Sequence, residues 1–159
     1  MSELAKPVLP GTAGSDYERY LRTDELLALQ KTADEWVHRD ELLFQSVHQT
    51  SEIWLKLAWN ELEEAARLVA DGDLAAALRL LRRANDCFKL VTLALDMLEH
   101  MSPWEYTEVR KVLGHGSGFD SPGFRELMRV GKLLGEAFHA ARERAGLSLV
   151  EVYTQGREH

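Results

Sequence analysis

The chain has 159 residues, of which 45% are apolar and 8% aromatic, a length that suits one well-packed domain better than two. Its 19 basic and 26 acidic residues give a net charge of -7, with no basic run longer than a pair, so we expect no nucleic-acid partner. Cys87 is the single cysteine, and neither an apolar leader nor a bilayer-spanning stretch is recognisable, which predicts a cytoplasmic protein without a membrane segment.

Residues 1–14 combine two of the four prolines with two glycines. They show no hydrophobic periodicity, which predicts an arm without regular structure. Ser15 then offers a side-chain oxygen that can cap a first helix. The apolar residues that follow predict a helix reaching about Gln30, with Tyr17 and Tyr20 on one side of it.

The segment 34–70 contains neither proline nor glycine, and its apolar residues recur at helical spacing. A second apolar stripe, which includes Phe44 and Trp59, runs beside the first. A helix that is apolar over so much of its surface must be covered on two sides. We therefore predict one long helix that lies at the centre of the fold.

Gly72 lies between two aspartates and interrupts this pattern. Apolar residues at steps of three and four then predict a second long helix over residues 74–98. Because the connection is so short, the second helix must run antiparallel to the first. The prediction is a helix hairpin.

Three features follow the hairpin. The sequence Ser-Pro-Trp-Glu at 102–105 is typical of a capping box and predicts a short helix through Val112. A glycine-dense loop follows over 114–122, and such loops often line sites. A last helix is predicted over about 124–145.

The sequence shows no internal repeat and no sustained alternation typical of strands. We therefore predict an all-α fold, a bundle of two long and about three shorter helices, with residues 15–159 forming a single domain.

The segment from Asp40 to Lys56 reads DELLFQSVHQTSEIWLK, and it closely resembles a signature of the tryptophan 2,3-dioxygenase family. Three further pieces resemble the same family in the same order, namely YERYL at 17–21, MSPWEYTEVR at 101–110 and SGFDS at 117–121. Together the resemblance extends over roughly residues 16–128. It implies a tryptophan 2,3-dioxygenase-like fold and an enzyme that acts on an indole-type amino acid or a derivative of one.

In that family a heme binds O2, and both oxygen atoms are inserted across the C2–C3 bond of an indole. The resemblance implies that His48 is the histidine that hydrogen-bonds the indole N–H and that Phe44 forms a wall of its pocket. Arg110 would bind the substrate carboxylate, because a guanidinium pairs with both of its oxygens. A mostly apolar pocket with these polar groups suits a zwitterionic aromatic amino acid.

The resemblance also implies an assembly. Family members are tetramers in which the N-terminal helices reach across, so Tyr17 and Tyr20 would complete the pocket of a neighbouring subunit. Ser117 and Gly118 would lie near the edge of the heme. We therefore expect a homo-oligomer, a dimer or a tetramer, with O2 as a possible second substrate.

The chain departs from the family where the heme iron is normally held. Family members have a late helix with a pattern like WR-x-x-H, followed by a GTGGS loop, whereas this chain reads ARERAG at 141–146 with no GTGGS segment after it. Another residue would have to ligate the iron. His139 is the first candidate, because Gly131, Gly135 and His139 are spaced four apart and could form a groove for a flat macrocycle.

Two alternatives stay open. A heme-free relative could use the same aromatic pocket for cofactor-independent chemistry, in which His48 moves a proton, or for binding only. A more remote alternative is a non-heme di-iron bundle, because the pairs Glu35 with His38 and Glu136 with His139 have the Glu-x-x-His spacing of such sites.

Overall fold

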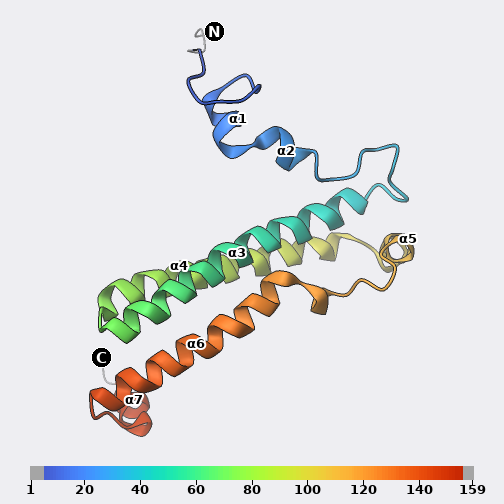
Figure 1. The fold of residues 1–159 in the computed structure, drawn as a ribbon. Helices are drawn as coiled ribbons and strands as arrows, with labels where there is room; N and C mark the ends of the chain where they lie inside the picture. The colour runs from blue at the N-terminus through green and yellow to red at the C-terminus, as the bar shows by residue number, and fades with distance from the viewer. Residues whose placement is uncertain (1–5, 156–159) are drawn as a thin grey trace.

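The computed structural model describes residues 6–155, which form helices and connections without a strand. The first five residues of the predicted arm lie outside this range. Figure 1 shows the long helices lying side by side, with the N-terminal segment extending away from them. The long helices are α3 (Glu41–Asp71), α4 (Leu74–Asp96) and α6 (Pro122–Arg144). The prediction of an all-α fold is confirmed.

The predicted hairpin is formed by α3 and α4. Gly72 ends α3 with a φ of 88°, and its amide donates to the carbonyls of Leu68 and Val69. This left-handed conformation suits glycine, which has no Cβ to clash. The Asp73 carboxylate then accepts a hydrogen bond of 2.9 Å from the Ala76 amide and starts α4.

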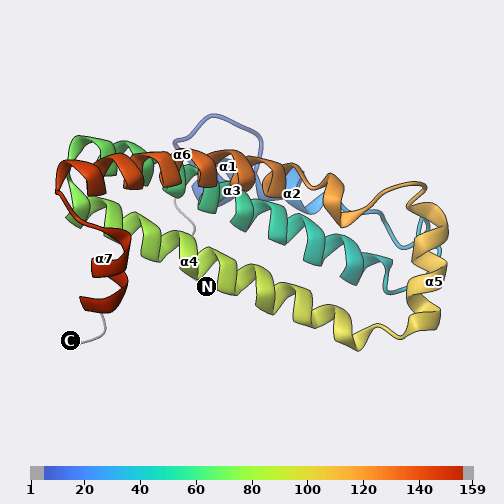
Figure 2. The ribbon, with the colours of Figure 1, turned by 90° about the horizontal axis from the view of Figure 1, so that it is seen from below.

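Helix α6 has 23 residues, as α4 does, so the bundle contains a third long helix where the sequence predicted only two. The apolar spacing predicts where α6 lies in the sequence. It does not show that α6 joins the bundle as a third long helix. Helix α3 lies between α4 and α6 and packs against both (Figure 2). This confirms that α3 is the central helix.

Small side chains fill the interfaces of the bundle. One cluster joins Ala58 with Ala84 and Cys87, and a second joins Ala65 with Val69 and Ala77. Larger side chains from α6, including Leu127 and Leu134, pack against these clusters. Alanine at these positions lets the helix backbones approach closely while still removing apolar area from water.

Short helices lie at the two ends of the bundle. The 3-10 helix η1 (Met97–His100) follows α4 and leads into α5 (Pro103–Val112), which crosses one end of the bundle. The second 3-10 helix, η2 (Gly118–Asp120), lies in the glycine-dense loop before α6. At the opposite end, Gly146 ends α6 with a φ of 68°, and α7 (Leu149–Gln155) follows.

The predicted first helix is wrong in its extent. It is divided into α1 (Asp16–Leu21) and α2 (Thr23–Leu27) by Arg22, which has a φ of 54°. The Arg22 side chain pairs with Glu25 one turn later. Helical periodicity continues through this break, so hydrophobic spacing alone could not find it.

The predicted start of the long helix at residue 34 is also wrong, because α3 begins at Glu41. The Glu41 side chain is 3% exposed and accepts hydrogen bonds from the Lys31 ammonium and from the Val37 amide, the latter at 2.9 Å. These bonds hold residues 31–37 in a loop that folds back on the start of α3. A helix through the same residues would lose both contacts.

The surface of the chain is large for its length. Its solvent-accessible area is 12003 Å², whereas a compact monomer of this size exposes roughly 8,000 Å². Many large apolar side chains, such as Leu27, Met128 and Phe119, lie open to solvent. Within residues 6–155, no helix is long and apolar enough to cross a membrane.

Candidate functional site

The first turns of α3 place an aromatic ring beside an imidazole. Phe44 and His48 are one turn apart, and their ring centroids are 4.1 Å apart at an angle of 32°. His48 Nδ1 lies 2.8 Å from the Phe44 carbonyl oxygen. Because a carbonyl only accepts, Nδ1 must carry the proton, and in the neutral ring Nε2 is left as an acceptor.

Helix α5 supplies a phenol and a guanidinium to the same region. It starts at a complete capping box, in which Ser102 accepts from the Glu105 amide at 3.3 Å and Glu105 accepts from the Ser102 amide. The bond from the Ser102 amide to the carboxylate lowers the pKa of Glu105. Tyr106 and Arg110 follow on one face of α5, and the Tyr106 ring centroid is 6.3 Å from that of Phe44.

The glycine-dense loop forms the third side. Ser117 caps η2, accepting from the Phe119 amide at 3.3 Å, while the Asp120 carboxylate accepts from the Ser117 amide at 3.0 Å. This reciprocal pair gives the loop a defined turn even though it is rich in glycine. A Cβ added at Gly118 would meet nothing within 4 Å, so the loop is open at this point.

These three elements line an open cavity of about 590 Å³, a volume typical of small-molecule sites. We call it the recognition cavity. Five of the site residues predicted from the sequence lie along its wall, although they come from distant parts of the chain. Its lining residues include Phe44, His48, Glu52, Tyr106, Arg110, Ser117, Gly118 and Ser121.

A second cavity of about 670 Å³ adjoins the first. We call it the apolar cavity, because side chains such as Leu55, Val91 and Leu127 form most of its wall. It lies among α3, α4 and α6. His48 and Glu52 line both cavities, so these two residues of α3 stand at the boundary between them.

Arg110 has a hydrogen-bond partner but remains accessible. Its Nη1 donates to the Gly114 carbonyl at 2.8 Å, just beyond the end of α5, and the side chain is exposed. The remaining donors of the guanidinium can still reach a ligand. The bond to Gly114 therefore orients the group without exhausting its donors.

Glu52 connects α3 to the start of α6. Ser121 Oγ donates to Glu52 Oε1, and the Gly123 amide donates to Oε2 at 2.9 Å. The two segments approach so closely that a Cβ on Gly123 would lie 2.6 Å from the Cβ of Leu55. Only glycine fits at position 123 without a shift of the helices.

Tyr17 and Tyr20 lie away from both cavities of their own chain. They are 69% and 78% exposed on α1, and neither α1 nor α2 has a buried residue. Side-chain hydrogen bonds tie the connection after α2 to the bundle, among them one from Gln49 Nε2 to the Leu29 carbonyl at 3.3 Å. Both tyrosines of the arm are therefore exposed to solvent and accessible to other molecules.

His139 lies on an exposed face of α6 and lines neither cavity. Its ring centroid is 6.0 Å from that of Phe138. The expected groove beside it does not form, because no other part of the structure faces these glycines: a Cβ added at Gly131 or Gly135 would meet nothing within 4 Å. The spacing of these residues is as predicted, but no facing element forms a pocket with them.

The di-iron alternative is wrong. Glu35 and His38 do not lie on a helix; the Glu35 carboxylate accepts from the Thr32 amide at 2.8 Å, and His38 Nδ1 accepts from the Asp40 amide at 3.2 Å. Among residues 6–155, no three His, Cys, Asp or Glu side chains form a group that could hold a metal ion.

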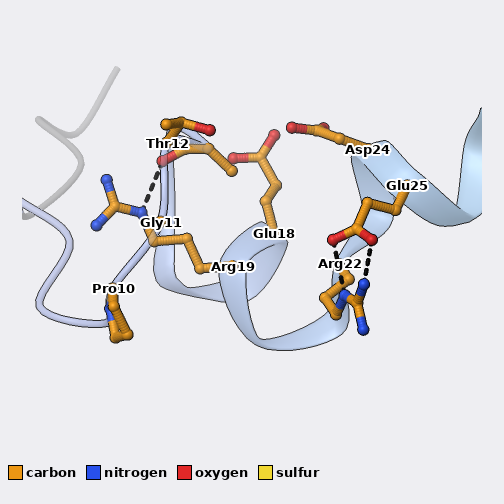
Figure 3. Close-up of a pocket in the computed structure, with 9 residues that line it drawn as sticks. Pro10, Gly11, Thr12, Glu18, Arg19, Arg22, Asp24 and Glu25 are labelled. Carbon is orange, nitrogen blue, oxygen red and sulfur yellow. Dashed lines mark hydrogen bonds and ion pairs between the residues drawn. The ribbon is translucent and has the colours of Figure 1, made fainter.

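A third hollow, of about 340 Å³, lies between the arm and α1 (Figure 3). Several of its charged groups already have partners: Arg19 Nε donates to the Ala13 carbonyl at 2.8 Å, and Arg22 pairs with Glu25. These contacts shape the arm itself. They leave the recognition cavity as the candidate functional site.

The sequence analysis did not assign Tyr106, Glu52 or Ser121 to this site. Tyr106 precedes Arg110 by one helical turn, and Glu52 follows His48 by one turn. Since residues four apart share a helix face, both could have been found by extending each predicted site residue along its helix. Ser121 could not, because its role depends on where Glu52 lies in space.

The chain is similar to proteins of one family. Residues 5–140 match the family described as Tryptophan 2,3-dioxygenase. The tryptophan 2,3-dioxygenase of Caulobacter vibrioides is 41% identical over 122 residues, which cover 77% of this chain and 46% of that protein. That of Bradyrhizobium diazoefficiens is 39% identical over 124 residues, covering 78% of this chain and 43% of that protein. The chain thus spans less than half the length of these relatives.

Proposed function

Because the chain belongs to the tryptophan 2,3-dioxygenase family, we propose that its recognition cavity binds an indole-type amino acid for oxidation by O2. The observation that carries this proposal is the meeting of Phe44, His48 and Arg110 in one cavity of about 590 Å³. An aromatic wall, a hydrogen-bond acceptor and a guanidinium are the three groups that an indole ring, its N–H and a carboxylate require.

Each residue has a role that follows from its contacts. The bond from His48 Nδ1 to the Phe44 carbonyl leaves Nε2 to accept the indole N–H. Phe44 and Tyr106 provide the aromatic surface for the ring. Arg110 binds the carboxylate with the donors that Gly114 does not use.

His48 can also act as a base. With the Nδ1 proton held by the Phe44 carbonyl, the free Nε2 can take up the indole proton as the ring is attacked. The same step serves a heme-free relative, so the residue's role does not depend on the cofactor. Binding without turnover is the alternative in which this proton stays on the ligand.

The residues present do not fit a heme held by this chain alone. The apolar cavity adjoins His48 and has room for apolar atoms, but His139, the expected iron ligand, is exposed and outside it. No step is therefore assigned to heme. Heme remains a proposed cofactor only of an assembly in which another segment supplies the axial ligand.

We propose a homo-oligomer in which the arm of one copy reaches the recognition cavity of another. The exposed tyrosines of α1 and the large accessible area of the chain support this arrangement. In it, Tyr17 and Tyr20 would close the cavity over the bound ligand and exclude water. Ser117 and Gly118 would form the opposite edge.

The direct test is titration of L-tryptophan and of indole against the wild-type chain and two variants. Arg110→Ala should weaken L-tryptophan binding by about 2 kcal/mol, the worth of a charge-assisted contact, and leave indole almost unaffected. His48→Ala should weaken both ligands, since both carry the N–H. Arg79→Ala, on the exposed surface of α4, is the control. Equal affinities in wild type and both site variants would refute the proposal.

Hemin titration tests the cofactor separately. If His139 is no axial ligand, the absorbance spectrum obtained with hemin should be the same in wild type and in His139→Ala. A sharp band that disappears in this variant would restore His139 as the ligand and would mean that α6 rearranges on binding.

A further inference from the structure

The wall between the two cavities contains a carboxylate that the proposed function does not use. Glu52 lies one turn beyond His48 on α3 and is half-buried. Both of its oxygens are occupied, one by the Ser121 hydroxyl and the other by the Gly123 amide. Both donors belong to the junction between the glycine-dense loop and α6.

The contacts form a continuous chain from α3 into the loop. Ser121 Oγ donates to Glu52 and at the same time accepts from the Phe124 amide at 3.1 Å, which caps α6. The carboxylate thus lies at the positive end of the α6 dipole, where a negative charge is favoured. Its position fixes the residue at which the loop ends and α6 begins.

The loop that ends there also forms the edge of the recognition cavity. Ser117, Gly118 and Ser121 line both cavities. Within the loop, the Asp120 amide donates to the Ser117 carbonyl at 2.9 Å, and the Ser121 amide donates to the Gly118 carbonyl at 3.3 Å. These bonds make the segment a compact turn whose last residue, Ser121, is bound to Glu52.

We propose that Glu52 is a positioning residue, which holds Ser117–Ser121 against His48 so that the recognition cavity keeps the shape its ligand needs. As far as ligand affinity is concerned, this inference rests on the proposed function. Its structural part, the anchoring of the loop, is independent of any ligand.

The chain offers a matched control. Glu63 on α3 accepts a hydrogen bond of 2.9 Å from Arg129 on α6, so it also joins α3 to α6 through a carboxylate. It lines neither cavity. Glu63→Gln therefore removes the same charge from the same pair of helices without touching the loop anchor.

The experiment compares Glu52→Gln with Glu63→Gln in the full chain. A carboxamide has one acceptor oxygen, so the side chain of the Glu52→Gln variant is not able to hold both donors as the carboxylate does. We expect solvent exchange of the Asp120 and Ser121 amides, measured by NMR, to accelerate on the order of tenfold in Glu52→Gln. Both amides donate to carbonyls within the loop and not to Glu52, so the change reports the turn rather than the lost bond. Glu63→Gln should exchange at the wild-type rate.

L-tryptophan affinity is the second readout. Glu52→Gln should bind it on the order of tenfold more weakly, at an unfolding midpoint close to that of Glu63→Gln. Ser121→Ala should have a similar effect, and the double variant should lose less affinity than the sum of the two single variants, because both changes break the shared contact between Ser121 and Glu52.

The outcomes separate the two proposals. Wild-type exchange rates in Glu52→Gln, or equal acceleration in Glu63→Gln, would overturn the positioning role. Faster exchange with unchanged L-tryptophan affinity would overturn its link to the ligand. If wild type binds no L-tryptophan, the proposed function fails, while the exchange rates still decide whether Glu52 anchors the loop.

Discussion

The three-helix bundle and the N-terminal arm are stabilised in different ways. In the bundle, α3, α4 and α6 bury clusters of small side chains against one another. The helices α1 and α2 bury no residue, and the arm is shaped by local hydrogen bonds such as the one from Arg19 to Ala13. Local hydrogen bonds exchange readily for bonds to water and contribute little net free energy. The bundle thus sets the stability of the chain, and the arm is available for contact with other molecules.

Removing a buried side chain from the bundle should have the largest effect. Leu55 is 1% exposed, and Leu55→Ala should lower the free energy of unfolding by about 2–5 kcal/mol, because apolar burial is lost and a void remains. Leu27→Ala, on the exposed surface of α2, should change it by less than about 0.5 kcal/mol. Urea unfolding followed by circular dichroism measures both, and comparable losses would show that the arm shares the core's stability.

The junction between the two regions should have an intermediate effect that depends on pH. Burial raises the pKa of Glu41, but the hydrogen bonds from Lys31 and the Val37 amide lower it by more, so it lies below its ordinary value. A carboxyl with a lower pKa in the folded state stabilises the fold above its unfolded pKa. That contribution is lost as the pH falls through the folded-state pKa.

Glu41→Gln should accordingly lower the free energy of unfolding by roughly 1–3 kcal/mol at neutral pH. The difference from wild type should shrink as the pH falls below about 4, where the wild-type carboxyl also becomes protonated. Glu64→Gln, an exposed partner of Arg67, is the control and should show little effect at either pH. A difference that stays constant with pH would mean that packing, not charge, is what Glu41 contributes.

The sequence predicts the bundle better than the arm for a physical reason. Where burial decides the structure, as in α3 and α4, apolar spacing records it directly. The breaks at Arg22 and before Glu41 depend on side-chain hydrogen bonds with Glu25 and Lys31. Such bonds do not change the spacing of apolar residues in the sequence. The helical periodicity therefore continues across both breaks and does not reveal them.

The same distinction applies to the site. His48 and Arg110 were found through the resemblance, and their helix neighbours Glu52 and Tyr106 follow from spacing of one turn. The exposed position of His139 could not be predicted, because its surroundings depend on which face of α6 packs against α3. Gly131 and Gly135 do lie one turn apart on α6, but they would form a groove only if another helix faced them.

The smallest effect on the chain's own stability is expected for the arm's tyrosines. Tyr20→Ala should leave the free energy of unfolding of the isolated chain within about 0.5 kcal/mol of wild type, because the ring is 78% exposed. If the arm docks on a second copy, the same change should weaken self-association on the order of tenfold, as loss of an interface tyrosine commonly does. Light scattering across a concentration series measures this. Tyr153→Ala removes a similarly exposed tyrosine from α7 and should leave association unchanged. A wild-type chain that stays monomeric at micromolar concentration, or equal weakening in both variants, would contradict docking through the arm and leave its exposed tyrosines without a proposed role.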